Sequence, residues 1–107
     1  MGDLRKKIIG EVDAALYVPS IGQTVYLIYE ECTLYVEKVH SLGKDSFIVE
    51  AYKRPDVKFN FIEWRYEDYG SRWFTDFDAC AEKILSRFSD EYELKEYDSK
   101  WYEVERL

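Results

Sequence analysis

The sequence predicts an α+β fold in which a small, strongly curved antiparallel sheet of four to six strands, SH3-like or barrel-like, is combined with two helices. Residues 24–66 form a series of short runs rich in Val, Ile, Tyr, Phe and Thr, divided by turn-forming segments. Residues 76–88 instead have apolar residues at helical spacing. At 107 residues, the chain is long enough for a single domain with one modest core.

The first 19 residues are predicted to contain an amphipathic helix. Gly10 weakens this helical pattern, and Pro19 with Gly22 ends it. The apolar residues that fall near one helical face within 3–16 are Leu4, Ile8, Ile9, Val12, Ala15 and Leu16. The single domain, residues 1–107, is therefore divided into an N-terminal helix (1–19), a sheet with a helix (20–88) and an acidic aromatic C-terminal extension (89–107).

The middle of the chain is predicted to form the sheet. Its four strands are expected at residues 24–30, 33–40, 46–53 and 58–66. In the second strand, Leu34 and Val36 alternate with Tyr35, so both faces have apolar groups. This pattern predicts one core face and a second face that is partly covered.

Glycine and proline indicate the connections of this sheet. Gly43 suits a hairpin turn, where it can adopt positive φ at little cost. Pro55 lacks a backbone N–H and is therefore expected in the loop between the third and fourth strands.

A turn, a short strand and a helix are expected after the sheet. Gly70 is predicted to adopt a left-handed conformation in the turn, and residues 71–74 are long enough for one strand. Thr75 and Asp78 form a T-x-x-D capping pattern. The residues with the clearest helical spacing are Phe77, Cys80, Ala81, Ile84, Leu85 and Phe88.

The C-terminal extension is both acidic and aromatic. Residues 89–107 contain seven acids and three bases, so they contribute −4 of the formal net charge of −7. The segment can be written as a hairpin, and a helix is left open. We expect it to bind a partner through Glu91, Tyr92, Glu93, Glu96, Tyr97, Asp98, Trp101, Tyr102, Glu103 and Glu105.

The sequence argues against the common catalytic and metal-binding motifs. His40 is the only histidine and is expected in a turn or a half-buried position, and no glycine cluster could cradle a phosphate. Cys32 and Cys80 have no CxxC spacing, and two reduced core thiols are preferred over a disulfide. The carboxylates around the turn at Gly70 are explained by the turn and the helix dipole; they are Glu63, Glu67, Asp68, Asp76 and Asp78. We therefore predict no enzyme activity, no cofactor and no metal.

The charge predicts a protein partner with a basic surface. A net charge of −7 disfavours direct binding to a phosphate backbone, whose affinity comes largely from cations. The alternative is a small nucleic-acid-binding barrel that stacks bases on sheet aromatics. Its candidate residues are Tyr35, Phe47, Tyr52, Phe59, Phe61, Trp64, Lys53, Arg54, Lys58 and Arg65.

Neither a signal peptide nor an apolar run of about 20 residues is found, which predicts a bacterial or host-cell cytoplasmic location without membrane contact. A monomer and a homodimer through a strand edge both stay open.

The segments "IGQTVYLIYEE" and "YEDYGSRWFTDFDACAEKIL" resemble a loose group of small uncharacterised proteins of Gram-positive bacteria and their phages. In that group a barrel-like sheet opens with a G-[DQ]-x-V-Y strand and closes with a D-[YF]-G-K-x-x-F-x-T-x-E-E-A turn and helix. The matching residues here are Gly22, Val25, Tyr26, Asp68, Tyr69, Gly70, Phe74, Thr75 and Ala79. Ser71 stands where the group has lysine, and Asp78 replaces a glutamate.

The resemblance implies an accessory protein of a phage or mobile element. Together with the acidic extension, it predicts a non-catalytic protein that binds a host protein. A sharper hypothesis is inhibition of a nucleic-acid-binding enzyme, such as a CRISPR nuclease, by imitation of the charge of DNA.

Overall fold

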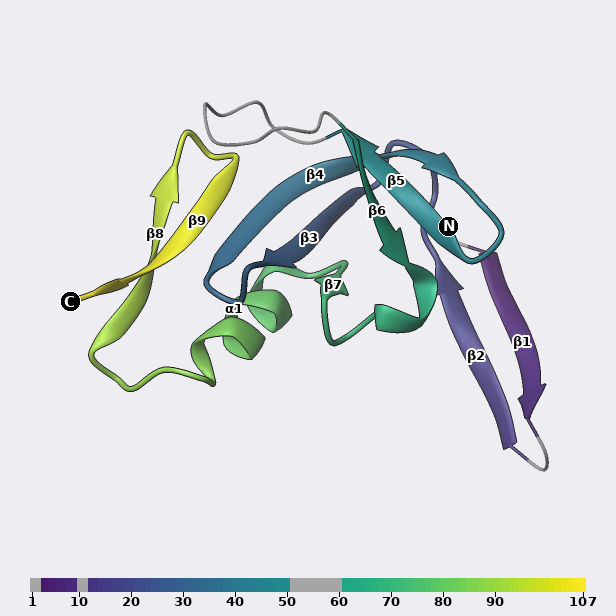
Figure 1. Cartoon of the computed structure of the whole chain (residues 1–107), viewed down its shortest axis with the longest axis horizontal. Coiled ribbons are helices and arrows are strands. Elements are labelled where there is room, and N and C mark those ends of the chain that lie inside the picture. The colour runs from purple at the N-terminus through teal and green to yellow at the C-terminus, as the bar shows by residue number, and fades with distance from the viewer. Residues whose placement is uncertain (1–2, 10–11, 51–60) are drawn as a thin grey trace.

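The computed structural model describes residues 3–9, 12–50 and 61–107 (Figure 1). They form two antiparallel sheets, one α-helix and one short 3₁₀ helix. In chain order the elements are β1 (Asp3–Ile9), β2 (Val12–Val18), β3 (Thr24–Tyr29), β4 (Thr33–Leu42), β5 (Ser46–Glu50), β6 (Phe61–Arg65), the 3₁₀ helix (Tyr66–Asp68), β7 (Trp73–Phe74), α1 (Phe77–Leu85), β8 (Tyr92–Tyr97) and β9 (Trp101–Arg106).

The predicted N-terminal helix is wrong, because β1 and β2 form a hairpin. They pair antiparallel from Asp3 opposite Val18 to Ile9 opposite Val12. The break in the helical pattern at Gly10 falls between the two strands. Glycine inside a helix costs about 1 kcal/mol, whereas β-branched residues favour strands, so these local preferences support the hairpin. In Figure 1 the hairpin projects from the end of the molecule opposite the C-terminus.

The second sheet is organised around the long strand β4. One edge of β4 pairs with β3, from Thr24 opposite Lys38 to Tyr29 opposite Thr33. Its other edge is shared: the first half pairs with β9 and the second half with β5. The pairing with β5 shifts register beside His40, which is an irregularity that bends a strand.

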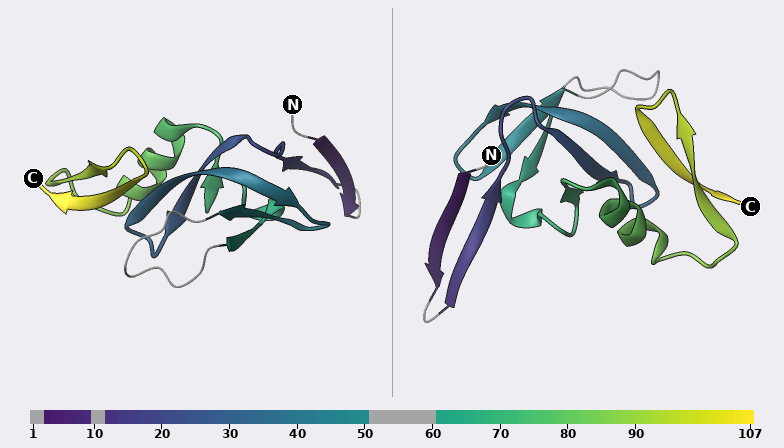
Figure 2. Two further views of the ribbon diagram at one scale, coloured as in Figure 1. Left: turned by 90° about the horizontal axis from the view of Figure 1, so that it is seen from above. Right: turned by 180° about the vertical axis from the view of Figure 1, so that it is seen from behind.

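This sheet curls into a half-barrel, as the views in Figure 2 show. Its principal strand order is β6-β5-β4-β3-β7, with β9 on β4 and β8 on β9. The predicted class, a small α+β fold with a curved antiparallel sheet and a helix after it, is confirmed. The expected strands at 46–53 and 58–66 correspond to β5 and β6 as far as they are described, and Pro55 lies outside the described residues.

The indole of Trp73 joins the two ends of the curled sheet. Trp73 in β7 is fully buried, and its Nε1–H donates to the carbonyl of Arg65 in β6 at 2.8 Å. Its ring also meets Phe47 of β5 edge-on at 4.7 Å. The inner core enclosed by this contact consists of Val18, Val25, Leu27, Tyr35, Val39, Phe47, Val49, Trp64, Tyr66 and Trp73.

An outer core lies on the opposite face of the sheet, beneath α1 and the C-terminal hairpin. Leu34 and Val36 belong to this outer core and Tyr35 to the inner one, so the predicted alternation in β4 is confirmed. The buried members of the outer core are Ile28, Leu34, Phe74, Cys80 and Ile84. Both faces of the sheet are therefore packed.

The cap of α1 differs from its prediction. Asp76, not Thr75, is the N-cap, and its carboxylate accepts from the backbone N–H of Ala79 at 2.9 Å. The hydroxyl of Thr75 instead contacts the hydroxyl of Tyr69 at 3.0 Å. The helix is also shorter than expected, Phe77–Leu85, although Phe88 still packs on the outer core.

The predictions of a positive φ at Gly70 and Gly43 have different outcomes. Gly70 has φ +85°, as expected, but Gly43 does not have positive φ. At Gly43 the constraint is space, because an added Cβ would lie 3.1 Å from the carbonyl oxygen of Ser46. Gly22 has φ +86° in the connection that leads into β3.

The two cysteines are free thiols in different environments. Cys80 is fully buried on the core-facing side of α1, as predicted, and burial raises the pKa of its thiol to about 12. Cys32 is exposed in the β3–β4 turn, so the prediction that it is a core thiol is wrong.

Replacing Trp73 by phenylalanine should destabilise the half-barrel. Trp73→Phe removes the Nε1–H donor and leaves the Arg65 carbonyl without this bond, so we expect the free energy of unfolding to fall by about 2–3 kcal/mol. The matched control is Trp64→Phe, because Trp64 is also buried but its Nε1 has no hydrogen-bond partner among the described residues. In urea unfolding, the loss of free energy of unfolding should be about 1–2 kcal/mol smaller for Trp64→Phe than for Trp73→Phe. Equal losses would contradict a structural role for the indole hydrogen bond.

The cap assignment gives a second stability test. Asp76→Ala should lower the free energy of unfolding by about 1 kcal/mol, because the N–H of Ala79 loses its acceptor at the start of α1. Thr75→Ala, at the position expected from the sequence, should cost less because its hydroxyl contacts only an exposed tyrosine hydroxyl. Thermal unfolding of the two variants decides between the caps, and a larger loss for Thr75→Ala would support the sequence-based prediction.

Candidate functional site

The C-terminal extension is a β-hairpin built into the sheet. β8 and β9 pair from Tyr92 opposite Arg106 to Tyr97 opposite Trp101. β9 is joined to β4, where Leu34 lies opposite Tyr102. The hairpin alternative of the prediction is therefore confirmed over the helix, and the hairpin is fixed to the body of the protein.

One face of the hairpin serves the outer core. The ring of Tyr102 lies 4.9 Å from that of Phe77 in α1, and Leu94 and Val104 pack against the same cluster. Burial is the main cause that raises the pKa of Tyr102, with the nearby Glu96 carboxylate second. Three of the predicted anchors therefore contribute to the fold. Tyr102 packs on the outer core, Tyr92 packs on Phe88 at 5.3 Å, and Trp101, on the opposite face, packs against the inner core.

The opposite face of the hairpin combines an aromatic pair with an excess of carboxylates. Tyr97 stacks on Trp101 with 4.4 Å between ring centroids and 12° between ring planes. We call this surface the acidic face, and its six residues are Glu93, Lys95, Tyr97, Trp101, Glu103 and Glu105. Among these six residues, three are carboxylates and one is a cation.

The electrostatics of the acidic face favour an added cation. Glu93 lies directly opposite Glu105, and such a like-charge pair destabilises a sheet by about 0.2–1 kcal/mol. Lys95 compensates only weakly, because its Nζ is 4.0 Å from the Glu105 carboxylate and its side chain is 60% exposed. The same Nζ lies 5.7 Å from the centroid of Tyr97, so this ring already receives a cation from within the chain.

Tyr97 and Glu105 are coupled through a hydrogen bond. The Tyr97 hydroxyl donates to the Glu105 carboxylate. This bond is the main cause that raises the pKa of Tyr97 to about 12, with burial and the neighbouring carboxylates adding to it. The bond holds the tyrosine ring in the stack and the carboxylate beside it.

The remaining predicted residues lie around this face. Glu91 forms an ion pair with Arg106 at 3.5 Å, and Glu96 accepts from the hydroxyl of Ser99 at 2.7 Å on the other side of the hairpin. Asp98 and Ser99 form the exposed turn, with φ values of 55° and 56°. The structure therefore brings five of the ten predicted residues onto the acidic face and places the other five on the core face or in flanking positions.

The other candidate chemistries find no assembled site among the described residues. No group of three metal-ligating side chains is present there. The carboxylates near Gly70 have local roles: Glu63 binds the Ser46 hydroxyl, Glu67 pairs with Arg65 at 2.8 Å, and Asp76 caps α1. His40 is exposed on β4 with its ring 5.0 Å from Phe61, so its predicted half-buried or turn position is wrong.

The predicted nucleic-acid surface is largely core. Tyr35, Phe47 and Trp64 are buried in the inner core and cannot offer their faces to bases. Phe61 is exposed, and Arg65 is engaged with Glu67. The other candidates lie outside the described residues; they are Tyr52, Lys53, Arg54, Lys58 and Phe59.

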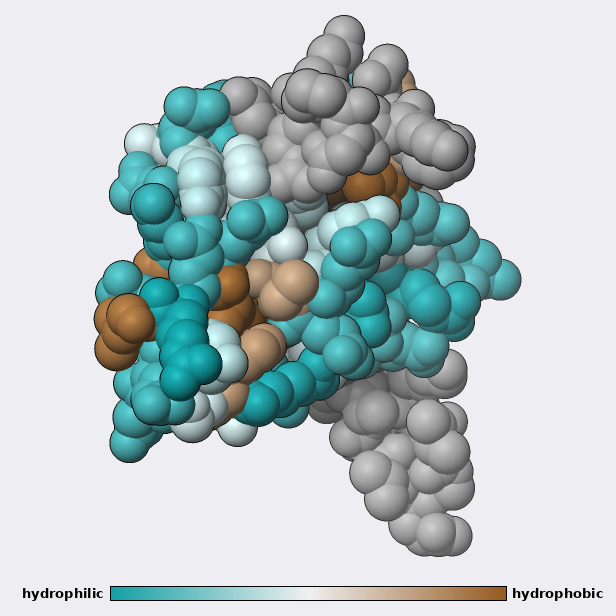
Figure 3. Space-filling view, turned by 60° about the vertical axis from the view of Figure 1, so that its left-hand side comes forward, coloured by the Kyte–Doolittle hydropathy of each residue, from teal (hydrophilic) through white to brown (hydrophobic). Residues whose placement is uncertain are grey.

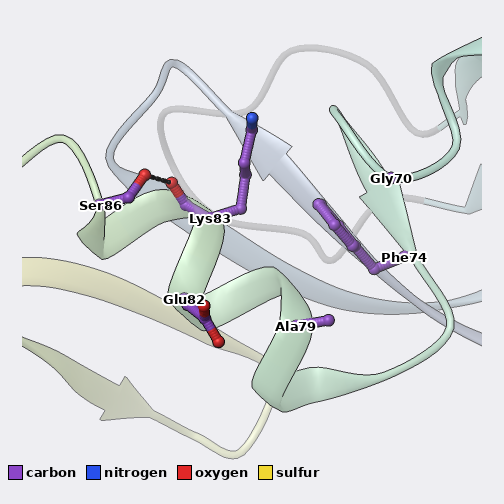
Figure 4. A pocket seen from close by; sticks show the side chains of 6 residues that line it. All are labelled: Gly70, Phe74, Ala79, Glu82, Lys83 and Ser86. Atoms are coloured by element: carbon purple, nitrogen blue, oxygen red, sulfur yellow. Dashed lines mark hydrogen bonds between the residues drawn. The ribbon is translucent and has the colours of Figure 1, made fainter.

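A groove that the sequence did not reveal runs between α1 and β7 (Figure 4). It has a volume of about 300 Å³ and is lined by Gly70, Phe74, Ala79, Glu82, Lys83 and Ser86. The hydroxyl of Ser86 donates to the carbonyl of Lys83 at 2.7 Å. The groove is open and lacks the convergent polar groups of an enzyme site.

Comparison with protein families, with curated proteins and with solved structures finds no match. The resemblance to small phage proteins therefore stays a prediction. Within the described residues, no helix has the length and apolar character needed to cross a membrane.

The coupling of Tyr97 to Glu105 predicts a tyrosine that ionises late. Carbon NMR of ring-labelled tyrosine should show one residue with a pKa of about 12, identified by its loss in Tyr97→Phe. Glu105→Gln should bring this pKa back toward 10, because the acceptor loses its charge. The folded-state pKa is raised, so the hydrogen bond stabilises the fold below pH 10 and is lost as the pH rises through 12. An unchanged pKa in Glu105→Gln would contradict the coupling.

Proposed function

We propose that this chain is a non-catalytic protein-binding protein whose acidic face contacts a basic surface of a partner. The observation that supports this most strongly is the placement of Glu93 directly opposite Glu105 beside the Tyr97–Trp101 stack. This arrangement costs local stability, and a Lys or Arg from a partner would relieve it.

The chemistry of the acidic face fits an arginine or lysine side chain. The carboxylates of Glu93 and Glu105 offer ion pairs to such a side chain, and the Tyr97–Trp101 stack lies beside them. Aromatic anchors beside polar groups are typical of compact protein interfaces. Figure 3, which brings the hairpin side of the molecule forward, shows a mainly hydrophilic surface interrupted by a small group of hydrophobic residues.

The partner class that best fits such a surface is a nucleic-acid-binding enzyme. Its basic cleft is built to hold a phosphate backbone, and an array of carboxylates competes for the same cations. The chain would then be an accessory protein of a phage or mobile element that inhibits a host enzyme, such as a CRISPR nuclease, as a mimic of DNA. The net charge of −7 is consistent with this role.

The proposal can be tested by affinity capture from bacterial lysate with variants of equal net charge. Glu93→Gln/Glu105→Gln neutralises the acidic face, whereas Glu50→Gln/Glu82→Gln removes the same charge from exposed positions elsewhere. We expect the wild-type chain to capture a basic protein. The Glu50→Gln/Glu82→Gln variant should capture about the same amount of it, and the Glu93→Gln/Glu105→Gln variant about tenfold less. Mass spectrometry identifies and quantifies the captured protein.

Two further results decide the partner class. Duplex DNA added to the captured complex should release the partner if DNA and the acidic face use the same cleft. Equal capture by both double variants would show that the acidic face is not the interface. Retention of the partner at saturating DNA would contradict the DNA-mimic form of the proposal.

A further inference from the structure

The outer edge of β8 is an unpaired strand edge at the border of the sheet. β8 pairs with β9 on one side, and no strand among the described residues pairs with its other side. The side chains of Glu93, Lys95 and Glu96 are exposed along this strand. An edge of six residues with free backbone groups can accept another strand.

The hydrogen bonds of the hairpin show which backbone groups point outward. The carbonyl of Glu91 accepts from Leu107, and that of Tyr97 accepts from Lys100, so both point toward the β9 side. The register between them is continuous, and backbone direction alternates along an antiparallel strand. The N–H and C=O groups of Leu94 and Glu96 therefore point away from β9.

We propose that the outer edge of β8 binds the same edge of a second copy of this chain, antiparallel and centred on Leu94. In that register Glu93 of each copy lies opposite Lys95 of the other, which creates two opposite-charge pairs. Leu94 lies opposite Leu94, and Tyr92 lies opposite Glu96. The proposal does not rest on the proposed function, although Glu93 and Lys95 also belong to the acidic face, because association of the purified chain with itself is measured without any other partner.

The sequence of β8 selects this register over the others. In an antiparallel pair, residues directly opposite each other point to the same side of the sheet. The two-fold axis that relates the two copies must therefore pass through a residue position, and not between two residues, for each face of one hairpin to continue into the same face of the other. Centring on Glu93, Lys95 or Glu96 places that charged residue against its own copy. Centring on Tyr92 opposes Glu91 to Glu93, and centring on Tyr97 opposes Glu96 to Asp98. Of the six positions in β8, only Leu94 brings Glu93 opposite Lys95. Its like-charge pairing, Asp90 opposite Asp98, lies at the two ends of the contact, outside β8.

The backbone supports the same centre. With Leu94 on the axis, its N–H in each copy donates to the Leu94 carbonyl of the other, and each Glu96 N–H donates to the Tyr92 carbonyl. These four bonds leave the existing bond from the Tyr92 N–H to the Ser89 carbonyl, 3.2 Å, undisturbed. A strand edge of this length buries less than a standard interface of about 1,600 Å², so we expect a reversible dimer with a Kd on the order of 100 µM.

Charge exchange between two variants tests the register. Glu93→Lys and Lys95→Glu each place like charges opposite one another in their own dimer, so sedimentation equilibrium should show Kd raised about tenfold for each alone. An equimolar mixture of the two variants restores both opposite-charge pairs and should associate about as well as wild type, as should the double variant Glu93→Lys/Lys95→Glu.

This design separates register from net charge. Glu93→Lys changes the net charge from −7 to −5 (−7 + 2) and lowers the overall repulsion between copies. An effect of net charge alone would therefore strengthen association of this variant, whereas the proposed register predicts that it weakens. Circular dichroism of each variant confirms that the fold is retained.

A pair of variants at Glu96 tests the backbone. Glu96→Pro removes the outward N–H without touching the β8–β9 bonds, and proline is tolerated at strand edges. Glu96→Ala removes the same side chain, including its contact with Ser99, and keeps the N–H. We expect Glu96→Ala to dimerise and Glu96→Pro to remain monomeric.

Three results would overturn the proposal. The first is that the wild-type chain stays monomeric at concentrations about tenfold above the expected Kd. The second is that the mixture of the two charge variants associates no better than either variant alone. The third is that Glu96→Pro and Glu96→Ala associate equally.

Discussion

The hydrogen bond from the Trp73 indole to the Arg65 carbonyl determines the shape of this protein. Strands β6 and β7 stand at the two ends of the sheet order, and a flat sheet would keep them far apart. The buried indole brings them together and encloses the inner core. Tyr69 lies 4.7 Å from the Trp73 ring and stacks on Tyr17 of β2 at 5.0 Å, so the same aromatic cluster also attaches the N-terminal hairpin.

The curl also decides where the C-terminal hairpin can bind. β4 pairs with β5 along its second half, and the bend near His40 leaves its first half available to β9. Residues far apart in the chain thus share one strand. The hairpin gains stability from the outer core on one face, which allows its other face to retain an unfavourable pair of carboxylates. Protein surfaces that bind partners commonly accept such a local cost.

The two proposed surfaces adjoin on one hairpin and share Glu93 and Lys95. The acidic face offers side chains to a basic partner, whereas the edge of β8 offers backbone groups to a second copy. A dimer formed through this edge would place two acidic faces on one continuous sheet. A partner with an extended basic surface could then contact both, which raises the effective affinity when the spacing of the two faces fits.

The local sequence pattern was sufficient to predict those elements in which the spacing of apolar residues shows which side chains are buried. The alternation of Leu34, Tyr35 and Val36 identified a strand packed on both faces, and the apolar spacing from Phe77 to Phe88 identified α1. The acidic and aromatic composition after residue 89 also indicated the candidate surface. Segment 3–18 was mispredicted because apolar residues at mixed spacing fit a helix or a hairpin, and strand pairing, which is not a local property, decided between them.

The division of the candidate site likewise depended on tertiary contacts. Tyr97 and Tyr102 are both aromatic residues within an acidic segment, and nothing in their immediate sequence distinguishes them. In the folded chain Tyr102 packs beside Phe77 beneath α1, whereas Tyr97 stacks on Trp101 among carboxylates. Composition established that this segment is acidic and aromatic. Which side chains belong to the core and which form a surface followed from the register of β9 on β4, because each strand has two faces and only pairing fixes which of them is covered.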